Sequence, residues 1–511
     1  MGAYIVRRLL ASILILLAAT FLMFVLMTYS SDPLAGIRSS NLSDADKALQ
    51  IQARIDALNL DQPLPVRYFL WLKGAAGCVV PGAKCDLGQN LKGQDVTALL
   101  GDAMPTTLRL VLAATVLSIL LGVAIGIVSA LRQYSGFDYT ITFAAFLFFA
   151  LPIFWVAVLL KQFGAIKIND WLADPALTLP VALTVGAFAA LLASAIVGGS
   201  RRQRLLVAGG AAVAAIAFIA LMIASGWFSN PGLGPGVVII GSALAAAFGT
   251  VLFTNLENWR VLGVALATAA SGVVIAYAAT PILRDPNWFT LFALGALATA
   301  VGVVIAMIFG GIDRPQAVRA SVVTSLGVGV LVFADHTVSS FAAYSSLVNG
   351  RPIATIGNQT PNFSGTFWEV TLDGMTHLIL PTMAIMLISF ATYSRYSRSS
   401  MLENMNADYV RTARAKGLTE RTVVLRHAFR NALIPIATLA ALDFGALIGG
   451  AIITETVFGW RGMGAMFNTA LNTSDLNQLM GFFVVTAIAV VIFNLIADIS
   501  YAILDPRIRL S

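Results

Sequence analysis

The chain has 511 residues, of which 58% are hydrophobic and only 11% are charged. Ordinary soluble domains are about 25% charged, so this composition excludes a soluble domain of average make-up. The formal net charge of +7 does not indicate nucleic-acid binding, because the basic residues lie at the ends of apolar runs, where cytoplasmic loops collect Lys and Arg.

The apolar residues form runs that are long enough to cross a lipid bilayer. About 20 residues at 1.5 Å rise per residue cover the roughly 30 Å hydrocarbon core, and lipid forces each such segment to be helical. The sequence therefore predicts an all-α polytopic membrane protein. The twelve predicted spans, in chain order, are Leu9–Tyr29, Thr107–Leu131, Tyr139–Phe163, Leu177–Val197, Leu205–Ala224, Gly236–Phe253, Val261–Pro281, Trp288–Phe309, Ala320–Ala334, His377–Tyr396, Leu433–Ile453 and Leu479–Leu504.

The first span follows Arg7 and Arg8 and ends near Tyr29 with no small-x-small cleavage site, which favours an uncleaved anchor over a secretory signal. Twelve spans place both termini in the cytoplasm. They also place there the segment from Arg395 to Arg430, which has the densest positive charge in the chain, as the positive-inside rule requires.

The first outer loop, residues 32–104, is long and mixed in polarity, and a helix is predicted near residues 45–58. Such a loop usually docks a partner or caps a pore, and the alternative is a poorly ordered connection. Cys78 and Cys85 lie seven positions apart in it and are too few for a structural zinc site. If the loop is extracytoplasmic, a local disulfide is favoured over two free thiols.

The most informative stretch runs from Asp408 to Gly417. Asp408 is a good N-cap and Gly417 is a good C′ residue, so a short helix is predicted between them. Thr419 can begin a second helix that runs toward Ile434-Pro435. The small residues Thr412, Ala413 and Ala415 would let a partner surface approach closely. The basic residues Arg411, Arg414 and Lys416 could donate hydrogen bonds at the rim of that contact. Taken alone, an ordinary juxtamembrane loop with solvated charge explains the stretch at least as well.

The order of residues resembles the cytoplasmic EAA loop of ABC-importer permeases. Thr412-Ala413 matches its small pair, Gly417 its glycine and Ile434-Pro435 its final hydrophobic-Pro pair. Arg411 stands where the family name would put Glu, a departure that is common in the peptide-importer branch.

Further motifs resemble the oligopeptide/dipeptide permease family, and the resemblance covers roughly residues 1–165 and 375–511. In chain order they are Arg7-Arg8, Leu60–Tyr68, Asp86–Gly88, Pro105–Leu108, Leu151–Trp155, Arg398–Glu403, Arg426–Asn431, Glu455–Trp460, Gly462–Gly464 and Leu504–Ile508.

The resemblance implies a type I importer permease core of six spans, and the chain departs from the family by about six further spans inserted in the middle. The predicted segments are 1–31, first span; 32–104, extracytoplasmic loop; 105–165, core spans two and three; 166–335, inserted hydrophobic helices; 336–376, extracytoplasmic loop; and 377–511, core spans with the coupling loop. The inserted spans are nearly free of charge and rich in Ala and Gly, which favours close helix packing rather than a polar path. A peripheral scaffold is favoured, and a docking surface for another subunit or lipid is the alternative.

The family implies several partners in the bacterial cytoplasmic membrane: a second homologous permease, two ABC ATPases and an extracytoplasmic peptide-binding protein. The chain has no Gly-x-x-x-x-Gly-Lys-Ser/Thr loop, so it is not expected to be the ATPase. ATP and Mg are expected on the partner subunits, with no cofactor in this chain. The helix before Gly417 would then be a lever between inward- and outward-facing states.

Ionisable residues near membrane depth are Lys161, Asp443, Glu455 and Asp498, and such charges usually face an interior or water. Asp443 and Glu455 are candidates for the substrate path. Asp443 could meet a charged peptide N-terminus or pair with a neighbouring helix. The three histidines give no metal pattern, and no catalytic arrangement stands out.

The predicted function is therefore the permease subunit of an ATP-driven importer for dipeptides or oligopeptides. A nickel or small-solute importer of the same family is an alternative. A stand-alone secondary transporter should show related halves, and none is seen. A membrane enzyme ranks last, because the inserted spans lack clustered acid/base or metal groups.

Overall fold

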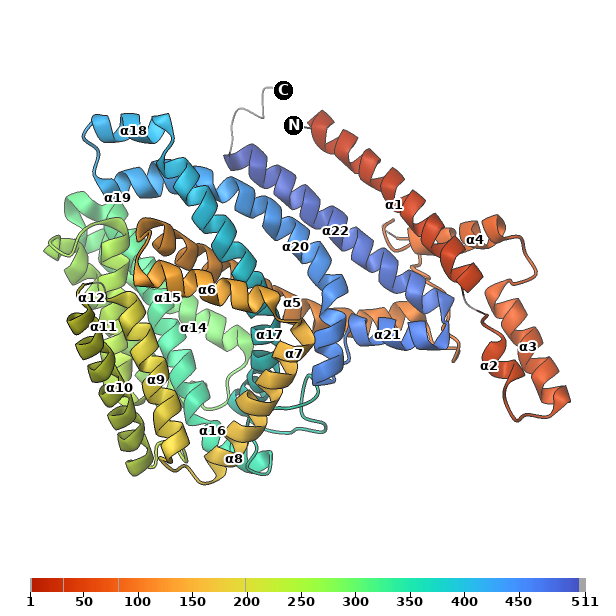
Figure 1. The fold of residues 1–511 in the computed structure, drawn as a ribbon, viewed down its shortest axis with the longest axis horizontal. Coiled ribbons are helices and arrows are strands. Elements are labelled where there is room, and N and C mark those ends of the chain that lie inside the picture. The colour runs from red at the N-terminus through yellow and green to blue at the C-terminus, as the bar shows by residue number, and fades with distance from the viewer. Residues whose placement is uncertain (1, 31, 81, 198, 505–511) are drawn as a thin grey trace.

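The computed structural model describes residues 2–504 apart from residues 31, 81 and 198 (Figure 1). The tail motif at residues 504–508 therefore lies almost wholly outside the described residues, and so does the side chain of Asp498. All named elements of the described chain are helical, and its one extended pairing is an isolated bridge between Gln89 and Asp95. This confirms the predicted all-α fold class.

Six helical segments form the core that the resemblance predicts. They are α1 (Gly2–Ser30); α5 (Val96–Leu131); α6 (Gly136–Ala150) with α7 (Ile153–Leu159), η1 (Leu160–Ile166) and α8 (Lys167–Ala173); α17 (Phe367–Met405); α20 (Phe429–Phe458); and α22 (Leu476–Leu504). α17 packs against α5, α6 and α20, and α22 packs against α1 and α20.

The contact between α5 and α17 depends on glycine. A Cβ at Gly126 would lie 2.6 Å from the carbonyl oxygen of Ser394, and one at Gly122 would lie 2.6 Å from the Cβ of Tyr393. Without these side chains the two backbones approach closely, as small residues allow in membrane helices.

The predicted span Tyr139–Phe163 is not one continuous helix. The chain bends by 105° between α6 and the helical run Ile153–Ala173. Leu151 is extended at the bend, with ψ 129°, and Pro152 follows it. Proline lacks a backbone N–H and disfavours helix at the residue before it, so the break has a local cause.

The inserted segment folds as two units, which make up the left-hand part of Figure 1. One unit is a hairpin of α9 (Leu179–Ile196) and α10 (Arg201–Ala224), and α9 packs on α6. The other, here called the inserted bundle, comprises α11 (Gly234–Phe253), α12 (Trp259–Ala278), α14 (Trp288–Phe309) and α15 (Arg314–Ser339), with the short α13 (Thr280–Leu283) and η2 (Gly311–Asp313). α15 brings this bundle into contact with α17.

The weakest predicted span, Ala320–Ala334, lies within α15, a helix of 26 residues. The helix begins before its apolar run, and Pro315 stands in its first turn, where proline is well tolerated. Near its other end, the carboxylate of Asp335 accepts hydrogen bonds from the amides of Leu233 and Gly234. The Asp335 carboxylate therefore ties the end of α15 to the start of α11.

Ten helices among the described residues are long and apolar enough to cross a membrane, and the bent pair adds an eleventh if it counts as one span. α20 is outside that count, but its 30 residues contain the predicted span Leu433–Ile453. Each of the twelve predicted spans therefore has a helix, although α5 and α17 begin well before the predicted positions.

The loop at residues 32–104 is built of α2 (Ala35–Arg38), α3 (Asp44–Leu58) and α4 (Leu64–Ala76), followed by the start of α5. α3 confirms the helix predicted near residues 45–58. Tyr68 of α4 is buried against α1, where its hydroxyl lies 2.9 Å from that of Thr20. A disulfide joins Cys78 to Cys85 after α4.

The predicted outer loop at residues 336–376 holds the end of α15, α16 (Phe341–Leu347) and the start of α17. In Figure 1 the start of α1, the end of α22 and α18 (Asp408–Ala415) lie at one face of the molecule, and α8 and α16 lie at the opposite face. This arrangement matches the predicted topology, in which the termini and the coupling loop share a side.

Candidate functional site: the helix Asp408–Ala415 and the buried polar contacts of the core

α18 is a short helix with a well-formed C-terminus. The amide of Gly417 donates to the carbonyl of Arg414 at 2.9 Å, and that of Leu418 donates to the carbonyl of Ala413 at 3.4 Å. Gly417 has φ +76°, as predicted for its C′ position. Together these bonds form a Schellman motif, which satisfies carbonyls that the helix end would otherwise leave unpaired.

The predicted N-cap was wrong by one residue. Ala407 is the N-cap, with extended backbone and no side-chain cap, and Asp408 is the first helical residue. The Asp408 carboxylate still lies at the positive end of the helix dipole, with Arg411 at 3.7 Å. Thr419 is the N-cap of α19 (Glu420–Thr422), where the sequence predicted the second helix to begin.

One face of α18 is held by its own chain. Val410 and Ala413 are buried in an apolar cluster with Met401 of α17 and Val423 of η3 (Val423–Ala428). Ala413, only 5% exposed, therefore does not belong to the surface offered to a partner, contrary to the interpretation from sequence. It is small because α18 packs closely on the chain beneath it.

The opposite face of α18 is exposed. Arg411, Thr412 and Ala415 lie on it, and Tyr409 and Lys416 are exposed at its edges. Arg414 is also exposed, but its guanidinium Nε bonds Glu420 Oε1 at 2.9 Å. The structure thus presents a narrow surface of small and basic side chains on a helix that is fixed from below.

An ion pair fixes α17 where it leads toward α18. Arg398 donates to Asp138 at 2.6 Å from Nε and at 2.7 Å from Nη2, and Asp138 is 2% exposed. The Ser129 hydroxyl and the Tyr134 amide also donate to this carboxylate. The pair therefore joins α5, α6 and α17. Bidentate pairing of this kind fixes orientation as well as adding energy.

Glu455, a predicted path residue, is fully buried in α20. Its carboxylate accepts from the Thr107 hydroxyl at 2.6 Å and from the Ala465 amide at 3.0 Å. Ala465 lies in the first turn of α21 (Met463–Thr473), so Glu455 caps the positive end of that helix. A Cβ at Gly462 would lie 2.5 Å from the Glu455 carboxyl carbon, so this motif needs glycine for close approach.

Asp443, the other predicted path residue, is half-buried on α20 and lies beside Tyr393 and Ser389 of α17. The structure thus gives it polar neighbours on an adjacent helix, which is one of the two alternatives that the sequence left open. Lys161 donates to the carbonyl of Val457 at 3.2 Å, near the negative end of α20.

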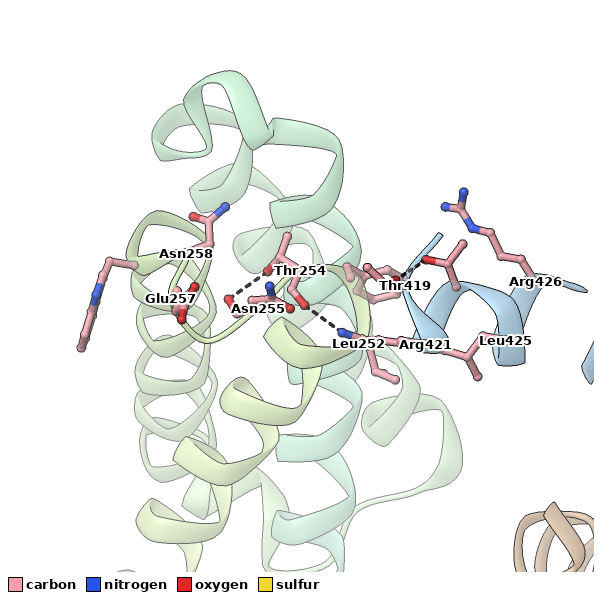
Figure 2. Close-up of a pocket in the computed structure, with 12 residues that line it drawn as sticks. Leu252, Thr254, Asn255, Glu257, Asn258, Thr419, Arg421, Leu425 and Arg426 are labelled. Atoms are coloured by element: carbon pink, nitrogen blue, oxygen red, sulfur yellow. Dashed lines mark hydrogen bonds between the residues drawn. The ribbon is translucent and has the colours of Figure 1, made fainter. Parts of the chain in front are cut away.

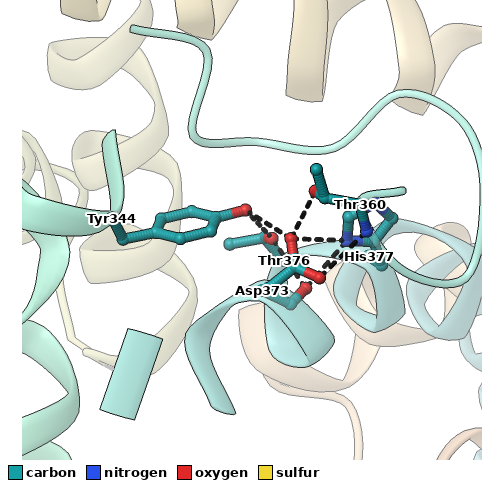
Figure 3. A network of polar contacts seen from close by, with 5 residues as sticks. All are labelled: Tyr344, Thr360, Asp373, Thr376 and His377. Atoms are coloured by element: carbon teal, nitrogen blue, oxygen red, sulfur yellow. Dashed lines mark hydrogen bonds and ion pairs between the residues drawn. The ribbon is translucent and has the colours of Figure 1, made fainter. Parts of the chain in front are cut away.

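A buried polar network lies on the face of the molecule opposite α18, under the loop that leads into α17 (Figure 3). Asp373 accepts from the Thr360 amide at 3.0 Å and from the Tyr344 hydroxyl at 3.2 Å, and His377 Nδ1 lies 3.5 Å from its carboxylate. Burial raises the pKa of Tyr344 to about 12, so its hydroxyl stays protonated and able to donate. The network holds the loop against α16 and α17.

The described residues contain no group of three or more His, Cys, Asp or Glu that could hold a metal ion. Two residues of structural importance were not singled out from the sequence, Asp138 and Arg421. Asp138 follows Ser135-Gly136 at the start of a span, but only its distance from Arg398 shows the pairing. Arg421 bonds backbone carbonyls of the inserted bundle, and no sequence pattern marks such a partner.

Comparison with known proteins agrees with this architecture. Residues 1–111 match the N-terminal family description of a binding-protein-dependent transport system membrane component, and residues 323–510 match the description of the inner membrane component. The oligopeptide transport system permease protein AppB of Bacillus subtilis is 27% identical over 512 residues, which cover 100% of both chains. The corresponding protein OppB of Mycobacterium bovis is 33% identical over 287 residues, 56% of this chain and 79% of the relative.

The dipeptide transport system permease protein DppB of Escherichia coli K12 is 43% identical over 138 residues, 27% of this chain and 41% of the relative. The helical core and these matches define the class of protein, a membrane component of a binding-protein-dependent transport system. Within that class, the chain belongs to the peptide ABC permease family.

Proposed function

We propose that this chain is the permease subunit of an ATP-driven peptide importer that receives its energy through α18. The observation that carries the proposal is the seating of this helix. Val410 and Ala413 anchor one face in the chain's own core, the Schellman motif at Gly417 fixes its end, and the opposite face is exposed. A push on such a helix passes to α17 and η3 instead of being absorbed by a loose loop.

The proposal divides the work among several chains. Two ABC ATPase subunits bind and hydrolyse ATP with Mg, a second homologous permease completes the translocation path, and an extracytoplasmic binding protein delivers the peptide. This chain supplies no catalytic residue and no cofactor. The peptide substrate is supported by the names of the relatives, which are oligopeptide and dipeptide permeases.

We place the protein in the bacterial cytoplasmic membrane, with both termini and α18 in the cytoplasm. The density of Arg and Lys in residues 395–430 supports this orientation. Asp443 remains our candidate for a residue that meets the peptide, because it is half-buried among polar neighbours in the core. Glu455 is a weaker candidate, since capping α21 already accounts for its carboxylate.

The coupling claim is tested with a bulky side chain on the exposed face of α18. Ala415→Trp should block close approach of the ATPase while leaving the buried face untouched. Its matched control is Ile312→Trp, at a residue that is 92% exposed in η2 of the inserted bundle. The measurements are copurification of the ATPase subunits and peptide uptake in membrane vesicles.

We expect A415W to insert normally but to lose both the ATPases and uptake, and I312W to keep both. If A415W assembles and transports like I312W, α18 does not receive the ATPases and the coupling claim is wrong.

A further inference from the structure

One side chain makes the described hydrogen bonds between the inserted bundle and the segment just after the coupling helix (Figure 2). Arg421 of α19 donates from Nη1 to the carbonyl of Thr254 at 3.4 Å and from Nη2 to the carbonyl of Val251. α11 ends at Phe253, so both carbonyls belong to its C-terminal end. The last carbonyls of a helix have no partner within the helix, and they carry a partial negative charge. A guanidinium donates hydrogen bonds to such carbonyls and brings the opposite charge.

Around this contact the two sides are separated by an open groove of about 930 Å³. The loop from Thr254 to Trp259 forms one wall, and residues between Thr419 and Arg426 form the other. Among the hydrogen bonds of the described residues, only the two from Arg421 cross it. Arg426 also lines the groove (Figure 2), but within the described part of the chain its side chain makes no hydrogen bond across it.

The same bundle is attached to the core at the opposite face. The Trp368 indole donates to the carbonyl of Leu283 at 2.6 Å, and the Phe367 amide donates to Asp285 at 2.8 Å. Both residues open α17, the helix whose other end leads into α18. The inserted bundle is therefore bonded to the core in two places, at the first turn of α17 and at the segment that follows the coupling helix.

We propose that Arg421 is a positioning residue that ties the inserted bundle to the segment after α18, so that the two move together when the coupling helix is pushed. The bundle is held at the start of α17, so the tie limits how far α19 can slip when α18 is loaded. This gives the inserted helices a role in energy coupling and goes beyond a passive scaffold. The inference rests on the proposed function, because it needs α18 to receive the push.

The test uses the complete transporter, reconstituted in liposomes with its ATPases and binding protein, and measures peptide transported per ATP hydrolysed. In Arg421→Ala we expect normal ATPase binding but about a fivefold lower ratio, as loss of a charge-assisted contact would give. Arg421→Lys keeps the positive charge but not the two-pronged guanidinium, so its ratio should lie between those of wild type and R421A. Arg426→Ala removes the same charge from the same groove without removing a described bond, and it should keep the wild-type ratio.

A second measurement separates a tie from a local folding effect. Asn255→Cys and Thr419→Cys, on opposite walls of the groove, are joined by a flexible bismaleimide; the native cysteines are already paired with each other. In the R421A background this bridge should restore the ratio. Failure of the bridge to restore it, or an R421A ratio equal to that of R426A, would overturn the inference. If the wild-type chain binds no ATPase at all, it is the proposed function that fails.

Discussion

The ion pair between Asp138 and Arg398 allows a quantitative test of how the core is held beneath the coupling helix. The Asp138 side chain is 3% exposed and that of Arg398 is 29% exposed. Arg398→Ala leaves a carboxylate that is nearly buried and whose remaining donors, among the residues that the structure describes, are the Ser129 hydroxyl and the Tyr134 amide. Breaking a buried pair from one side costs about 3–5 kcal/mol, and the partial exposure of Arg398 places this case near 3.

Asp138→Asn should cost less, about 1–2 kcal/mol, because it keeps the shape and leaves a guanidinium that water can reach. Combining D138N with Arg398→Gln should cost less than the two single changes together, since contacting residues are not additive. The control pair is Arg38 with Asp32, which lie 2.8 Å apart but are exposed on both sides, and for which about 0–1 kcal/mol is expected.

The assay is thermal unfolding of the purified chain in detergent, with all variants compared under one condition. A membrane protein of this size need not unfold in two states, so the order of the midpoints is the quantity to read. We expect R398A to lie lowest, D138N next, and the Asp32→Asn control near wild type. If R398A and D138N melt no lower than D32N, the pair does not hold α6 to α17 and the reasoning is refuted.

Four further predictions follow from single contacts. Burial raises the pKa of the Asp475 carboxyl in the folded chain. The stability that this residue contributes is therefore greatest below the unfolded pKa of about 3.9 and is lost as pH rises through the folded pKa. Between these two pKa values the melting midpoint of wild type should fall relative to that of Asp475→Asn, and a rise would contradict the prediction. Replacing Cys78 and Cys85 with Ser should cost about 2–3 kcal/mol in the outer segment and speed its proteolysis, whereas unchanged cleavage would argue against the bond. Gly126→Val should lower the midpoint by overpacking α5 against α17, whereas Gly101→Val in the same helix, with open space around it, should cost less; equal effects would refute the close-approach argument. Glu455→Ala should destabilise more than Glu455→Gln, which can still accept from the Ala465 amide, and the reverse order in thermal unfolding would exclude capping.

The sequence predicted the parts of this fold that depend on local chemistry. Apolar runs located the helices, and the alternation of charged loops predicted which ends share a face. α3 and the left-handed Gly417 were predicted from patterns that act within a few residues. The bend at Pro152 was equally local, and it was missed because the apolar run continued through it.

The candidate site was only partly predictable. Length and capping signals located α18, but the side of the helix that faces inward depends on where Met401 and Val423 lie, and the sequence could not show that for Ala413. The Arg421 contact is harder still, since its acceptors are backbone carbonyls that any residues would supply. Contacts between segments distant in the chain become visible only once the fold is known.

The most direct test of the account is a site-specific crosslink from α18 to the ATPase subunit. Ala415→Cys lies on the exposed face, and Ala413→Cys, the same substitution two residues earlier, lies on the buried face. In the assembled transporter, a thiol-directed crosslinker should join A415C to an ATPase and leave A413C unjoined. An assembled, transporting complex in which A415C gives no crosslink to an ATPase would contradict the central claim that α18 receives the power stroke.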